Sequence, residues 1–95
     1  MIDSRKLTKE FINYICDWVE QEYKNKNHDG FMETLRDKEA YWVADKGIEK
    51  RIQNKLFKRL NLKSTVKYEI NSGTGNGELY IKLKFGAGKG ENNGS

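Results

Sequence analysis

The residues of this sequence best suited to chemistry are the cations of the segment Lys46–Lys63. Seven lysines and arginines stand there against a single acid, Glu49. The excess of six positive charges exceeds the +4 of the whole chain, so the remaining residues are slightly acidic together. Clustered cations neutralise phosphates and release counterions, which supplies most of the affinity for a nucleic-acid backbone. The sequence therefore predicts an anionic partner, most often a nucleic acid.

A helix is expected to display these cations. Ile48, Ile52, Leu56 and Leu60 step by four residues and predict a buried stripe. Asp45 is expected to cap the N-terminus of this helix. The opposite side carries no acid, whereas a merely solvated helix face usually mixes both signs of charge. Its residues, with one more cation just before the helix, are Lys46, Lys50, Arg51, Asn54, Lys55 and Lys58.

Each of these residue types has a role that its chemistry favours. The lysines and the arginine are expected to hold phosphates, because several cations then lie within one Debye length of each other. Asn54 is the candidate for reading an adenine edge if the helix enters a major groove. Arg59 falls next to the apolar stripe and is expected to lie along its edge with its charge in water.

Catalytic and metal-binding groups are sparse. The single histidine, His28, lies in a polar segment, and the single cysteine, Cys16, lies on the flank of a predicted helix. A zinc site needs more ligands of these types, and nothing near Cys16 indicates an activated nucleophile. The glycines and lysine of Phe85–Gly90 lack the following helix that a phosphate loop requires. We therefore expect no enzyme activity, no metal and no cofactor.

The elements that position the basic segment follow from hydrophobic periodicity. Residues 5–25 place their large apolar side chains on one helical face and predict the spine of the core. Asn25–Gly30 predicts a loop, with Asp29 capping a second helix over Gly30–Ala44. Within that second helix, the run Ala40–Ala44 has an extended strand as its alternative.

From Thr65 the apolar period changes to two, which predicts strands over residues 65–71 and 79–85. The intervening Ser72–Gly77 predicts the turn of a β-hairpin, with Asn76-Gly77 suited to positive φ. The solvent side of this hairpin extends the basic patch through Lys67, Tyr80, Lys82 and Lys84. Tyr80 among lysines suits base stacking in a single strand, or packing against its cross-strand neighbours.

Three helices followed by a basic hairpin with a glycine-rich tip resemble the winged-helix family over residues 5–85. The resemblance implies that the third helix reads the major groove of DNA and that the hairpin touches the backbone or the minor groove. That family commonly has a short strand after its first helix, and Asn25–Gly30 predicts none. Gly47 is the candidate turn glycine of a helix-turn-helix over Trp42–Leu56.

The sequence thus predicts one small α+β domain over residues 1–85, three helices followed by a C-terminal antiparallel β-hairpin, and a flexible tail over 86–95. We expect the protein to be cytoplasmic and to bind no membrane. Its expected partner is a nucleic acid, with DNA favoured over RNA, and its expected role is that of a regulator or accessory factor. Its alternative is a protein-interaction module or inhibitor, of the type encoded by phages and mobile elements, that docks its basic face on an acidic protein. A homodimer is compatible with either.

Overall fold

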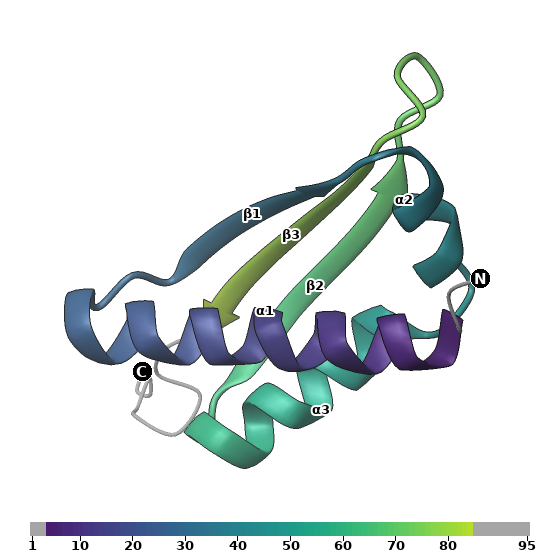
Figure 1. Ribbon diagram of the computed structural model, residues 1–95. Helices are drawn as coiled ribbons and strands as arrows, with labels where there is room; N and C mark the ends of the chain where they lie inside the picture. Colours follow the sequence, from purple (N-terminus) through teal and green to yellow (C-terminus); the bar gives the residue numbers. More distant parts are fainter. Residues whose placement is uncertain (1–3, 85–95) are drawn as a thin grey trace.

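The computed structural model describes residues 4–84 and shows an α+β protein of three helices and one three-stranded antiparallel sheet (Figure 1). The elements run in the order α1 (Ser4–Lys26), β1 (Gly30–Leu35), α2 (Asp37–Val43), α3 (Ile48–Leu60), β2 (Lys63–Ile70) and β3 (Gly77–Lys84). The predicted fold class is confirmed at this level. The tail predicted over 86–95 lies outside the described residues. Within 4–84, no helix is long and apolar enough to cross a membrane.

The sheet contains one strand more than the predicted hairpin. Its order is β1-β3-β2, so β3 pairs with β2 along the hairpin and with β1 on its other side. The prediction of a helix over Gly30–Ala44 is therefore wrong for Gly30–Leu35, which forms β1. Only the C-terminal half of the predicted segment is helical, as α2. The extended alternative for Ala40–Ala44 is also wrong, since α2 continues to Val43.

The spacing of the apolar residues explains that error. Phe31 and Leu35 are four residues apart, a separation that brings two side chains to one face in a helix and in a strand alike. In the structure both are buried, while Met32 and Thr34 between them are exposed. Asp29 does not cap a helix: its carbonyl accepts a hydrogen bond from the Leu83 amide at 2.7 Å, and its carboxylate pairs with Lys82.

Helix α1 is the spine that the sequence predicted, and it lies across one face of the sheet (Figure 1). Its buried residues include Ile15 and Val19, which pack in the same core cluster as the inward side chains of the strands. Trp18 meets Phe31 of β1 edge to face, with ring centroids 5.2 Å apart. Such pairs add to the stabilisation that burial alone provides, so α1 is held firmly on the sheet.

Helix α3 packs through the predicted stripe, with Ile48, Ile52 and Leu56 buried and Leu60 partly buried against the same core. Its N-terminal cap is Gly47, which adopts a left-handed φ of 67° and makes no side-chain capping bond. Asp45 is also left-handed, at φ 60°, and lies outside the helix, so the predicted aspartate cap is wrong.

The β2–β3 connection differs from the predicted Asn76-Gly77 turn. The left-handed glycine is Gly75, at φ 79°, whereas Gly77 already belongs to β3. Gly77 is buried, and a Cβ atom there would collide with the ring of Tyr68. The Tyr68 hydroxyl donates a hydrogen bond to the Ala40 carbonyl at 2.7 Å, so this ring ties α2 to the sheet.

Candidate nucleic-acid interface

A groove of about 430 Å³ runs between α1 and α3. Its walls carry four cations and two amides, its one apolar residue is Ile12, and none of its lining residues is an acid. The polar lining residues are Lys9 and Asn13 of α1 with Arg51, Asn54, Lys55 and Lys58 of α3. The groove therefore gathers four of the predicted α3 residues and adds two from α1.

The cations of this groove differ in how firmly they are held. Lys55 is half-buried, and its ammonium donates a hydrogen bond of 2.6 Å to Oδ1 of Asn13. Lys9, Arg51 and Lys58 are exposed and form no ion pair or hydrogen bond through their side chains within the described residues. Lys55 thus points into the interhelical contact at the groove, and the other three remain available to an anion.

Arg59 is the cation of α3 that does not belong to this groove. Its guanidinium pairs with Asp17 and, at 3.3 Å, with Glu20, both on α1. Arg59 is half-buried, in agreement with its expected position beside the apolar stripe. The pairing neutralises Arg59 within the protein and joins α1 to α3.

A second groove, of about 320 Å³, lies on the other side of α3 where β2 begins and β3 ends. It is lined by Gln53, Asn54, Phe57, Lys63, Ser64 and Lys84. The Gln53 side-chain amide donates to the Ser64 carbonyl at 3.2 Å, and the buried Ser64 Oγ has no hydrogen-bond partner within the described residues. This groove also has no acid in its lining.

Phe57 and Lys9 are among the lining residues of these grooves that the sequence did not predict as part of the site. Phe57 is 48% exposed, whereas phenylalanine is among the residue types most often buried. The helical wheel carried the signal, since residue 57 falls opposite the buried stripe. Lys9 comes from the polar side of α1, and nothing local in the sequence indicates that it faces α3.

The predicted hairpin residues separate into two groups. Lys84 lines the groove beside Phe57. Lys67, Tyr80 and Lys82 lie on the exposed face of the sheet, where they alternate with core positions, and Lys84 continues this face at the end of β3. Each of the first three contacts an acid of this protein: Lys67 lies 3.7 Å from Glu69, Lys82 lies 2.8 Å from Asp29, and the Tyr80 hydroxyl donates to Glu78.

Lys46 and Lys50 complete the predicted set. Lys46 is exposed in the turn that leads into α3, and Lys50 is exposed in the first turn of the helix. The side chain of Lys50 lines neither groove, and it has no ion-pair partner within residues 4–84. Asn54, one turn further along, lines both grooves and so marks the ridge between them.

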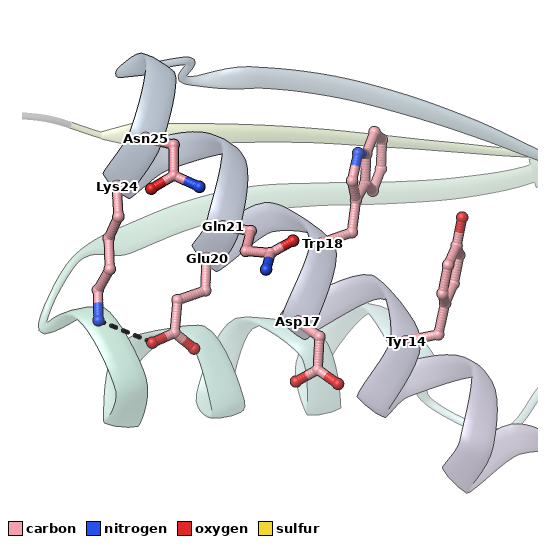
Figure 2. Close-up of a pocket in the computed structure, with 7 residues that line it drawn as sticks. All are labelled: Tyr14, Asp17, Trp18, Glu20, Gln21, Lys24 and Asn25. Carbon is pink, nitrogen blue, oxygen red and sulfur yellow. Dashed lines mark hydrogen bonds and ion pairs between the residues drawn. The ribbon is translucent and has the colours of Figure 1, made fainter.

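A larger groove, of about 660 Å³, follows the outer side of α1 and has a different character. Figure 2 shows the rings of Tyr14 and Trp18 on the side of α1 towards the strands, with the carboxylates of Asp17 and Glu20 on the other side. Those two carboxylates pair with Arg59, and Glu20 also with Lys24. The carboxylates of this surface are paired, and none of the predicted binding residues lines it, so it is not part of the candidate interface.

The two groups weighed for catalysis lie in contrasting surroundings. Cys16 is fully buried, and burial raises the pKa of its thiol to about 11. His28 is exposed, with its Nδ1 3.3 Å from a carboxylate oxygen of Glu22. Within residues 4–84 no three His, Cys, Asp or Glu side chains gather closely enough to hold a metal ion.

No family model matches the chain, and neither a curated protein nor a solved structure matches it significantly. The geometry and charge of the site are therefore the basis for proposing a role.

Proposed function

We propose that this protein binds nucleic acid, with DNA favoured over RNA, through α3 and the groove that α3 forms with α1. The observation that carries the proposal is the lining of that groove, in which Lys9, Arg51, Lys55 and Lys58 converge without an acid. The cations come from two elements distant in sequence. Folding has therefore concentrated positive charge beyond what the helix alone provides.

Electrostatics supports a polyanionic partner. Three of these cations have no anionic partner of their own within the described residues, and they repel one another across a narrow groove. A phosphate placed there relieves the repulsion and releases condensed counterions. Arg59 lies on the same helix but is neutralised by α1, so the charge left available is concentrated on one side of α3.

The order of elements adds weight to the resemblance to the winged-helix family. The short strand that this family commonly has after its first helix, and that Asn25–Gly30 did not predict, has its counterpart in β1 at Gly30–Leu35. The resemblance implies that the third helix enters the major groove. It therefore favours α3 as the contacting element and DNA as the partner, with a regulatory or accessory role.

Fluorescence anisotropy with labelled duplex and single-stranded DNA, titrated with salt, tests this proposal. Neutralisation of three to four phosphates gives a slope of log K against log salt of about −3 to −4 on duplex. The variant Arg51→Glu/Lys58→Glu should abolish binding at physiological salt. The control Lys26→Glu/Lys38→Glu changes net charge equally at exposed positions outside both grooves, and it should retain most of the affinity.

Two results would contradict the proposal. Equal losses in the two charge-reversal variants would mean that net charge, and not the groove, governs the interaction. Absence of binding to any nucleic acid at low salt would leave the α3 face as a docking surface for an acidic protein, the alternative that the sequence also allows.

A further inference from the structure

The exposed side of α3 is a ridge between two grooves. Asn54 lines both grooves, and Lys50 and Phe57 precede and follow it on the same exposed arc. These three residues occupy positions i, i+4 and i+7 of the helix, so they form one row. With a rise of 1.5 Å per residue the row is about 10 Å long, which corresponds to about three base-pair steps.

Cations line both sides of this ridge. The α1 side carries Lys9, Arg51 and Lys58, and the sheet side carries Lys63 and Lys84. A duplex offers the matching shape, because a backbone of phosphates borders each side of its major groove. The major groove is about 12 Å wide and admits one α-helix. A single strand has one backbone and would leave one side of the ridge without an anion.

Phe57 is the residue of the ridge that phosphate binding does not explain. Its side chain is 48% exposed between cations, where an apolar ring gains nothing from water or from phosphate. Among the groups in a major groove, the methyl of thymine is the apolar one, and phenylalanine is among the side chains that contact it. One turn away, the Asn54 amide has the donor and acceptor that match the major-groove edge of adenine.

We infer that α3 reads A·T base pairs of B-form DNA, with Phe57 against a thymine methyl, Asn54 on adenine and the second backbone held by Lys63 and Lys84. The inference rests on the proposed function and names its substrate class. RNA duplexes are disfavoured on two grounds. Their deep, narrow major groove does not admit side chains, and uracil lacks the methyl.

The test compares two short duplexes that contain A·T pairs alone, identical except that uracil replaces every thymine in one of them. Burial of one methyl predicts that wild-type protein binds the thymine duplex about fourfold more tightly. Phe57→Ala should bind both duplexes equally, and Phe57→Leu should keep the preference. Phe57 is exposed, so both variants should fold, and their thermal unfolding is measured alongside.

A matched variant separates the two parts of the inference. Lys63→Ala/Lys84→Ala should weaken binding to both duplexes several-fold, lower the salt slope by about two, and preserve the ratio between thymine and uracil. A double-stranded RNA and a single strand of the same length complete the set. Both should bind at least tenfold more weakly than the thymine duplex.

Failure of the inference is distinguishable from failure of the proposed function. A thymine preference that persists in Phe57→Ala overturns the role of Phe57 while DNA binding stands. Single-stranded DNA or RNA bound as tightly as the thymine duplex overturns the ridge-in-groove arrangement. Absence of binding to every probe overturns the proposed function itself.

Discussion

At the scale of single residues, the contact between Tyr68 and Gly77 shows how one side chain restricts which residue can occupy a neighbouring position. The ring of Tyr68 occupies the space that a Cβ atom at position 77 would need. We expect Gly77→Ala to displace the ring, break its hydrogen bond to the Ala40 carbonyl and lower the free energy of unfolding by about 2 kcal/mol. Urea denaturation measures the loss.

Two variants control for the intrinsic cost of replacing glycine by alanine in a strand. Gly30→Ala places a Cβ where no atom lies within 4 Å, so its stability should change little or rise slightly. In a Tyr68→Val background the cost of Gly77→Ala should largely disappear. A cost that is equal in both backgrounds would mean that the ring does not cause it.

Tyr68 also predicts how stability depends on pH. Burial raises the pKa of its phenol from 10.0 to about 12 in the folded protein. Folding therefore favours the neutral phenol, whose contribution is complete below pH 10 and is lost as pH rises through 12. Tyr68→Phe should be about 1 kcal/mol less stable than wild type at neutral pH, and this difference should shrink above pH 10.

Urea denaturation of both proteins over this alkaline range provides the measurement. The other tyrosines are common to the two proteins, so their titration cancels in the comparison. A difference that stays constant up to pH 12 would show that the Tyr68 phenol does not carry the alkaline loss.

At the scale of elements, α3 uses neighbouring cations for different purposes. Arg59 joins α3 to α1 through Asp17 and Glu20, whereas Lys58 lines the groove without a partner among the described residues. Arg59→Ala should reduce the free energy of unfolding by about 1 kcal/mol and leave the salt slope of DNA binding unchanged. Lys58→Ala should leave stability unchanged and lower the slope by about one.

Urea denaturation and salt-titrated anisotropy on the same two variants check this division. Because the two residues are adjacent on one helix, each variant serves as the control of the other. Loss of slope in Arg59→Ala would place its guanidinium on the phosphates and would contradict the pairing with α1.

The whole molecule has a basic α3 side that continues onto the exposed face of the sheet at the register pair of Lys63 and Lys84. Lys67 and Tyr80 lie on that face, opposite the inward core positions of β2 and β3, and their polar groups contact Glu69 and Glu78. Their register pair lies four positions along the strands from the pair of Lys63 and Lys84, so we expect a duplex bound along α3 to end short of them. Lys67→Ala/Tyr80→Ala should therefore change duplex affinity by less than about twofold, since surface contacts to acids add little.

The same anisotropy assay tests this prediction, with Lys58→Ala as the positive control. If the double variant weakened binding as much as Lys58→Ala, the sheet face would belong to the interface. A larger loss of affinity for single-stranded DNA than for duplex would then indicate base stacking on Tyr80, which the interleaving of aromatic and basic residues in the sequence suggests.

The sequence by itself determined the features that depend on local periodicity and composition. The 3.6-residue period predicted α1 and the buried stripe of α3, and the alternation of Val66 to Ile70 and of Leu79 to Leu83 predicted β2 and β3. Charge counting predicted the basic helix. These properties can be predicted from the sequence because they depend only on a residue and its near neighbours along the chain.

Only the tertiary structure decided the features that depend on contacts between distant segments. The spacing of Phe31 and Leu35 fits a helix and a strand equally, and pairing with β3 selected the strand. Packing of α1 on α3 neutralised Arg59 and brought Lys9 to the groove. The number of charges follows from the sequence. The packing of the elements decides which charges remain unpaired and which face each other.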